Sequence, residues 1–257
     1  MTQTSTPSAG AAASPPRKSR KWWYIGGAAL LVVLLLGFGI WYFVFRDDAP
    51  EAVDITRAGE TAQESGQESQ DSSSLDGTWR IDPSVGSFSD FSGTFVGYRV
   101  QEELASIGAK TAVGRTPDVD GSLEIDGTTI PSAEFTANLT TLVSDEDRRD
   151  GALRDQAIQT SQFPTATFTL TEPIELDKVP ADGVSIDVDA VGTLTLHGVT
   201  KDVTIPLEAQ RNGDVIAVTG QLDIVFADYA IEQPTSFAVL SIEDHGILEV
   251  QLFFSKT

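Results

Sequence analysis

The chain has 257 residues with 38 acidic and 17 basic side chains, a formal charge of −21, and no cysteine. This charge argues against nucleic-acid binding, which depends on Lys and Arg side chains that neutralise phosphates. The lack of cysteine excludes disulfides, thiolate metal sites and thiol nucleophiles, while the 40% share of hydrophobic residues suffices for one folded domain.

The charge is distributed unevenly along the chain. Residues 1–45 contain no acidic residue and four basic ones, all within 17–21, so the remainder carries 13 basic and 38 acidic residues, a net charge of −25. Residues 1–21 are otherwise mostly small and polar, and we expect a disordered tail there.

An uncharged apolar run follows at residues 22–45. As a helix it would be long enough to cross the roughly 30 Å hydrocarbon core of a bilayer, and both its ends carry aromatic residues, which favour membrane interfaces. We therefore predict a transmembrane helix rather than a cleaved signal peptide, whose apolar core is only about 7 to 15 residues. The preceding basic residues predict a single-pass protein of the cell membrane with a cytoplasmic N-terminus and an extracytoplasmic C-terminal domain.

Residues 46–76 are acidic and rich in Ser, Gln and Glu. Such a composition offers too little apolar surface to offset the entropy of ordering the chain. We predict a flexible linker that holds the following domain near the bilayer.

Residues 77–257 alternate apolar and polar side chains over at least eight short segments, separated by turns such as Asp-Gly and Asn-Gly. This period indicates strands with one face in a core and the other in water, and many strands in succession predict an all-β antiparallel barrel or sandwich. The residues expected to face the interior are Val96, Tyr98, Val100, Leu123, Ile125, Phe135, Leu139, Phe168, Leu170, Leu194, Leu196, Ile205, Leu207, Ile224, Phe226, Leu248, Val250 and Leu252.

One segment, residues 144–159, breaks this period. It places Leu153 and Ala157 on one helical stripe, and Ser144 and Asp147 stand at capping-box spacing. The segment predicts a short helix packed over one end or side of the sheet.

Several motifs resemble the YceI-like family. They are GTWRIDPSVGSF at 77–88, DRRDGALRDQAI at 147–158, FPTATFTL at 163–170, LTLHGVTKDVTIPLEA at 194–209 and DYAI at 228–231, in this order over nearly all of the C-terminal domain. The resemblance implies an eight-stranded lipocalin-like barrel with one short helix. It also implies an apolar channel, in which some members of the family hold a polyisoprenoid or a similar long-chain lipid. The residues themselves show no motif for a metal or another cofactor, and we expect none.

The residues alone leave the content of the barrel open. An eight-stranded barrel is just wide enough to be filled by side chains or to hold one slender ligand. The pattern by itself favours a filled barrel acting as a structural or protein-interaction module, whereas the resemblance favours a lipid-binding protein. A lipid-modifying enzyme is a third alternative, although His197 and His245 show no metal-ligand spacing.

Arg149 and Arg154 in the predicted helix are candidate contacts for the head group of a lipid, since a guanidinium suits a phosphate. The same segment contains five acidic residues that could instead pair with these arginines along a solvated helix face.

Overall fold

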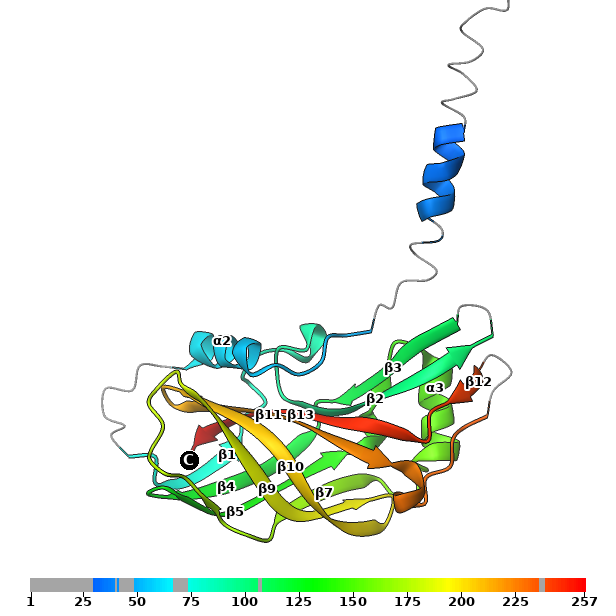
Figure 1. Cartoon of the computed structure of the whole chain (residues 1–257). Helices are drawn as coiled ribbons and strands as arrows, with labels where there is room; N and C mark the ends of the chain where they lie inside the picture. Colours follow the sequence, from blue (N-terminus) through cyan, green and yellow to red (C-terminus); the bar gives the residue numbers. More distant parts are fainter. Residues whose placement is uncertain (1–29, 40, 42–48, 67–73, 106–107, 236–238) are drawn as a thin grey trace, which may run out of the picture. The chain divides into compact units, whose positions relative to one another are not determined.

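The structure of the chain, a computed structural model, describes residues 30–39, 41, 49–66, 74–105, 108–235 and 239–257 (Figure 1). The chain divides into two compact units, Met1–Arg46 and Asp47–Thr257, which are described separately.

In the first unit, residues 30–39 are helical, and their large apolar side chains are exposed. None of the helices formed by the residues described in the structure is both long and apolar enough to cross a membrane. Much of the predicted transmembrane segment 22–45, including residues 22–29, lies outside the described residues, so its membrane insertion stays a prediction.

The second unit is built on one antiparallel sheet (Figure 1). Its strands in the described part of the chain are β1 (Gly77–Ile81), β2 (Phe95–Leu104), β3 (Gly108–Thr116), β4 (Val119–Asp126), β5 (Thr129–Asn138), β6 (Val143–Ser144), β7 (Thr165–Leu170), β8 (Ile174–Glu175), β9 (Ser185–Leu196), β10 (Val199–Asn212), β11 (Val215–Val225), β12 (Val239–Ile242) and β13 (His245–Lys256). The order β1-β4-β5-β7-β9-β10-β11-β13 is closed by pairing of β13 with β1, which makes an eight-stranded barrel. The predicted all-β barrel is confirmed.

The last strand, β13, has a different neighbour along each half. Residues 254–256 pair with β1, whereas residues 247–251 pair with β2. Beyond β2 the sheet continues through β3 to β6, and β12 also pairs with β2. The barrel therefore closes through β1 at one end and is extended by the β2–β3 hairpin at the other.

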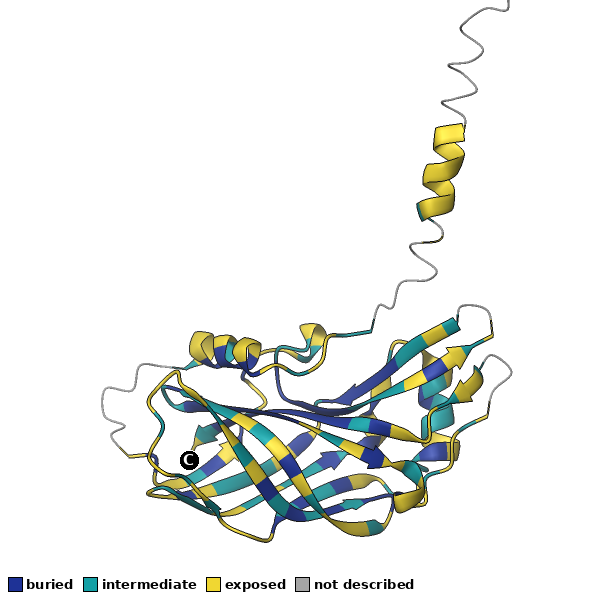
Figure 2. Cartoon of the chain, viewed as in Figure 1, coloured by how far each residue is buried: buried dark blue, intermediate teal, exposed yellow. Residues whose placement is uncertain are grey.

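Burial alternates along the strands as the period of two requires (Figure 2). The interior contains Trp79, whose ring is 2% exposed and whose Nε1 donates to the Leu75 carbonyl at 2.9 Å. At the β4–β5 and β10–β11 turns, Gly127 and Gly213 adopt φ values of 60° and 64°, the left-handed conformation that a side chain disfavours.

The structure shows a helix, α2 (Ile55–Ser65), inside the region predicted as a flexible linker. Asp54 caps its first turn by accepting a hydrogen bond from the Arg57 amide at 3.1 Å. The helix buries Ile55, Ala58 and Ala62, which recur at helical spacing.

The buried face of α2 packs on the outer surface of the barrel. The residues it meets there are Val85, Val215, Ala217 and Phe253. The Asn212 amide also donates to the Gly59 carbonyl at 3.1 Å. The prediction of a flexible linker over 46–76 is therefore wrong for residues 55–65, because one isoleucine and two alanines suffice for docking when a sheet offers them a complementary surface.

The outer face of β13 is covered rather than solvated. Glu249, expected in water from its parity, is fully buried and lies 2.7 Å from both Nε and Nη2 of Arg115 and 3.5 Å from Nη1 of Arg99. These arginines also donate to the carbonyls of Pro50 and Glu51, at 2.5 and 2.6 Å. The segment before α2 thus closes over a buried charged cluster, which we call the Arg99–Glu249–Arg115 triad.

The predicted helix in 144–159 is confirmed as α3 (Asp147–Ala152), which continues into a π-helical turn at Leu153–Ala157. The expected capping box is not formed. Instead, the Ser144 amide and hydroxyl both donate to the buried Asp150 carboxylate, at 2.9 and 2.6 Å.

Candidate functional site

Two apolar cavities lie inside the barrel. Cavity A, of about 120 Å³, is bounded by β2, α3, the π-helical turn and the first half of β13. Cavity B, of about 130 Å³, is bounded by β4, β5, β9, β10, β11 and the second half of β13. Apart from a few polar groups at their edges, both are lined by aliphatic and aromatic side chains.

The predicted interior residues divide between these cavities. Those lining cavity A are Val96, Tyr98, Val100, Leu139, Leu196, Ile224, Phe226 and Leu248. Those lining cavity B are Leu123, Ile125, Phe135, Leu170, Leu207, Val250 and Leu252. The remaining three, Phe168, Leu194 and Ile205, are at most 2% exposed and belong to the packed core.

Cavity A has a polar border made by residues from β2 and α3. Nη2 of Arg149 donates to Glu102 Oε1 at 2.5 Å, and Nη1 of the same side chain bonds to Asp145. Glu102 and Arg149 both line the cavity. Burial acts to lower the pKa of Arg149, but the hydrogen bond and the charge of Glu102 outweigh it, so the pKa is raised and the guanidinium stays charged.

Two buried donors at this border have no acceptor among the described residues: the Tyr98 hydroxyl and Nε of Arg149. Burial raises the pKa of Tyr98, so the phenol is neutral and keeps its proton. A guanidinium can only donate, and a neutral phenol can donate its proton. The cavity therefore combines an apolar body with donors that suit an oxygen acceptor.

The structure places the two arginines that were predicted as head-group contacts differently. Arg149 lines cavity A, whereas Arg154 is exposed on the π-helical turn and lines neither cavity. Glu102 was missed, although it continues the parity of Val96, Tyr98 and Val100 on the same strand. The alternation could have identified it, because β2 runs to Leu104 and position 102 therefore faces the same side as positions 96, 98 and 100.

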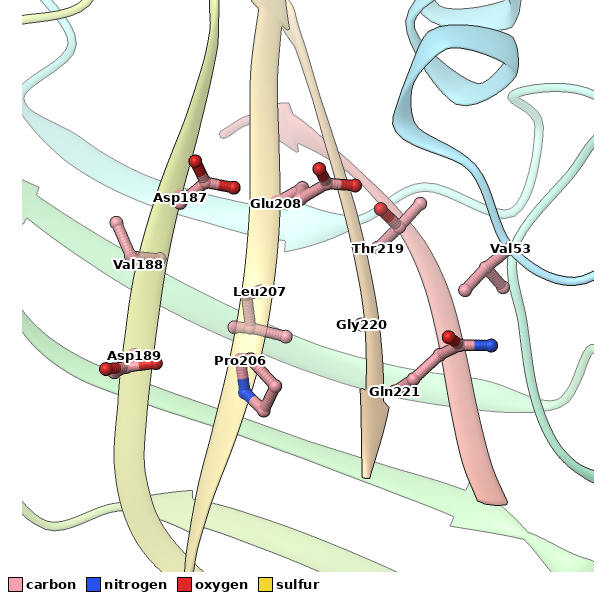
Figure 3. A pocket seen from close by; sticks show the side chains of 10 residues that line it. All are labelled: Val53, Asp187, Val188, Asp189, Pro206, Leu207, Glu208, Thr219, Gly220 and Gln221. Atoms are coloured by element: carbon pink, nitrogen blue, oxygen red, sulfur yellow. The ribbon is translucent and has the colours of Figure 1, made fainter. Parts of the chain in front are cut away.

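Two more hollows lie outside the barrel interior. A groove of about 320 Å³ lies on the outer face of β9, β10 and β11. Asp187 and Glu208 stand opposite each other there on neighbouring strands (Figure 3). A polar cavity of about 500 Å³ lies between residues 50–64 and the outer face of the barrel. Within the described ranges, no group of three or more His, Asp or Glu side chains is placed to hold a metal ion.

The two histidines lie away from both cavities. His197 is buried in the β9–β10 turn, where its Nδ1 lies 2.9 Å from the Tyr229 carbonyl oxygen and its ring packs edge-on against Phe163. His245 is exposed and contacts Asp244. Neither arrangement brings a base next to a nucleophile or a cavity.

Comparisons with known proteins agree with this architecture. A family model described as the YceI-like domain matches residues 79–254. Protein YceI of Escherichia coli is 35% identical over 124 residues, which cover 47% of this chain and 58% of that protein. A UPF0312 protein of Pseudomonas aeruginosa is 36% identical over the same shares, so the match spans less than two thirds of these relatives.

Two solved structures share the fold. A polyisoprenoid binding domain from Saccharophagus degradans has a TM-score of 0.51 at 23% identity and covers 64% of this chain and 94% of its own. BcnA of Burkholderia cenocepacia has a TM-score of 0.50 at 17% identity and covers 67% of this chain and 98% of its own. From the family match and the closed barrel, we conclude that the chain belongs to the YceI-like family.

Proposed function

We propose that the chain binds a polyisoprenoid or another long-chain lipid inside the barrel. The observation that carries this proposal is the pair of apolar cavities within a closed barrel, one of them bordered by unpartnered donors. An apolar cavity of this kind stays dry and takes up apolar molecules, and burial of each methylene of a ligand contributes about 0.8 kcal/mol. A related structure is described as a polyisoprenoid binding domain, which supports the same class of ligand.

In this proposal the polar end of the ligand lies at the border of cavity A. Tyr98 and Nε of Arg149 donate to an oxygen of the ligand, for example a carbonyl, hydroxyl or phosphate oxygen. The chain then acts as a binding protein: Tyr98 and Arg149 hold the ligand, while the Glu102 carboxylate at the same border pairs with Arg149.

Native mass spectrometry of the purified full chain tests this function. We expect a co-purifying apolar adduct, or uptake of a long-chain isoprenoid alcohol from vesicles. Replacing Tyr98→Phe together with Arg149→Met removes the free donors and should weaken retention of the alcohol, whereas the exposed Arg154→Met should not. A chain that carries no adduct and takes up no lipid would instead act as a filled structural or protein-interaction module.

We further propose that residues 22–45 anchor the chain in the cell membrane, with residues 1–21 in the cytoplasm and the barrel outside. The docked carbonyl of Pro50 shortens the expected linker. Positions 45 and 50 are five residue steps apart, and an extended chain of that length spans at most about 17 Å. An anchored barrel would therefore receive a lipid across a short distance of water.

The absence of cysteine allows a direct test of this topology. A Glu103→Cys variant carries a thiol on an exposed strand position of the barrel, and a Ser8→Cys variant carries one in the N-terminal tail. In intact cells, a membrane-impermeant maleimide should label the first variant and spare the second. The reverse pattern, or labelling of neither, would contradict the proposed orientation.

A further inference from the structure

The two cavities lie one after the other along the same strands and are separated by a layer of side chains. On β7, Ala166 lines cavity A and Leu170 lines cavity B, while Phe168 stands between them and lines neither. On β9, Leu194 stands in the same way between Leu196 of cavity A and Ala190 of cavity B. The interior is thus divided at the level of these two residues.

Phe168 is the largest side chain of this layer. It is 2% exposed, is the pairing partner of Leu194, and its ring stacks on Phe135 with centroids 5.4 Å apart. A glycine on the neighbouring strand makes room for the ring. A Cβ atom added at Gly192 would lie 2.4 Å from the Thr169 carbonyl oxygen and 2.6 Å from Cζ of Phe168, both far inside van der Waals contact.

The layer limits which ligands can bind, because each cavity by itself is small. At about 120 and 130 Å³, each is slightly smaller than a cavity of about 150 Å³ that binds one benzene molecule. A chain of two or more isoprene units therefore does not fit in one cavity. It has to occupy both, and to do so it must displace the packed layer between them.

We propose that Phe168, resting on Gly192, is a gate between the two cavities and sets the length of apolar chain that the barrel accepts. This inference rests on the proposed lipid binding and adds the residue that determines its chain-length specificity. A short chain binds in one cavity with the ring in place. A long chain binds only when the Phe168 ring leaves its position, and the ring then loses its stacking on Phe135 and its contacts with the barrel wall.

The gate predicts opposite effects for two substitutions. Phe168→Leu, with Phe168→Ala as a second and larger reduction, lowers the barrier between the cavities and favours long chains. Gly192→Ala adds a methyl group that crowds both the Thr169 carbonyl and the Phe168 ring, so it pushes the ring into the lumen and disfavours long chains. Phe253→Leu is the matched control, because this ring is also fully buried but lies on the outer face of the barrel against α2.

The experiment measures binding of prenol and geraniol, with one and two isoprene units, to the full chain by native mass spectrometry titration. For Phe168→Leu we expect the ratio of the affinity for geraniol to that for prenol to rise about tenfold, which corresponds to about 1.4 kcal/mol. For Gly192→Ala we expect it to fall, and for Phe253→Leu to stay at the wild-type value.

The outcomes separate the gate from the function on which it rests. If the wild-type chain binds neither alcohol, the proposed lipid binding is wrong and the gate with it. If it binds both, and neither Phe168 variant changes the ratio, lipid binding stands and the gate is refuted. An equal change in Phe253→Leu also refutes the gate, since loosening of the barrel would then explain the effect.

Discussion

The Arg99–Glu249–Arg115 triad allows a quantitative test of how the barrel is covered. We predict that Glu249→Gln, which keeps the shape of the side chain and removes its charge, strongly destabilises the second unit. Glu249 is 0% exposed, and the side chains of Arg115 and Arg99 are only 3% and 14% exposed. The substitution would leave two guanidinium groups with no carboxylate in a site that water reaches poorly.

The magnitude follows from this burial. Removing one partner of a buried ion pair costs about 3–5 kcal/mol of stability. Because the amide oxygen of Gln still accepts one hydrogen bond, we expect the free energy of unfolding to fall by about 3 kcal/mol. Burial already lowers the pKa of Arg115, against the opposing effect of Glu249, which shows how unfavourable the site is for an unpaired charge. Such a loss is a large fraction of the 5–15 kcal/mol typical of a domain.

Equilibrium unfolding in guanidinium chloride, followed by circular dichroism, measures the effect on the full chain. Glu103→Gln is the matched control, since this carboxylate is exposed on the adjacent strand β2 and should change the stability by less than about 0.5 kcal/mol. Thermal unfolding of both variants at low and high NaCl adds a second criterion, because buried pairs are screened weakly. A loss for Glu249→Gln that is as small as for the control, or that disappears at high salt, would refute the assigned burial of the triad.

Three further predictions concern the cavity border, helix α2 and the start of the domain. Burial raises the pKa of Tyr98, so the neutral phenol keeps its full contribution to the free energy of unfolding up to about pH 10 and loses it at higher pH, where the phenol ionises in the unfolded chain. Tyr98→Phe should therefore reduce the loss of unfolding free energy between pH 8 and pH 11 in denaturant titrations, and an unchanged loss would contradict the burial. Ala62→Arg places a charge at a fully buried position and should detach α2 from the barrel. Hydrogen exchange should then show fast amide exchange over 55–65 while the barrel amides stay protected, whereas Glu64→Arg, at an exposed position of the same helix, should leave the exchange of α2 slow. Hydrogen bonds from Ser84 and Ser255 lower the pKa of Asp82, so the ionised carboxylate stabilises the fold at neutral pH and this stabilisation declines as the pH falls below about 4. Asp82→Asn should therefore lower the free energy of unfolding by about 1 kcal/mol at pH 7 and by less at pH 2, and equal losses at both values would argue against an ionic contribution.

Much of the barrel could be predicted from local patterns. The period of two identified the interior side chains correctly, and 15 of the 18 predicted residues line a cavity. The break in period at 144–159 identified α3. These features depend on neighbours within a few residues, where alternation and helical spacing are directly visible in the sequence.

The predictions that failed depended on what covers a surface. Glu249 shares the parity of solvated strand residues, yet it is buried because residues 50–51 and their arginine partners cover it. Helix α2 was missed for the complementary reason: its small buried face gains stability only against a sheet surface that includes Val215, Ala217 and Phe253, more than 150 positions later in the chain. Neither relation is visible in a local pattern, since both arise from contacts between distant segments.

The sequence by itself determined the fold class, the inward set of side chains and, through its motifs, the family. Tertiary structure alone decided that β13 closes the barrel with β1, that Arg149 reaches the interior beside Glu102 while Arg154 does not, and that Phe168 divides the interior in two. The physical reason is that the alternating sequence of a strand indicates which of its faces is buried. Which buried side chains meet depends on the register between paired strands, and this register is set by pairing between segments far apart in the chain.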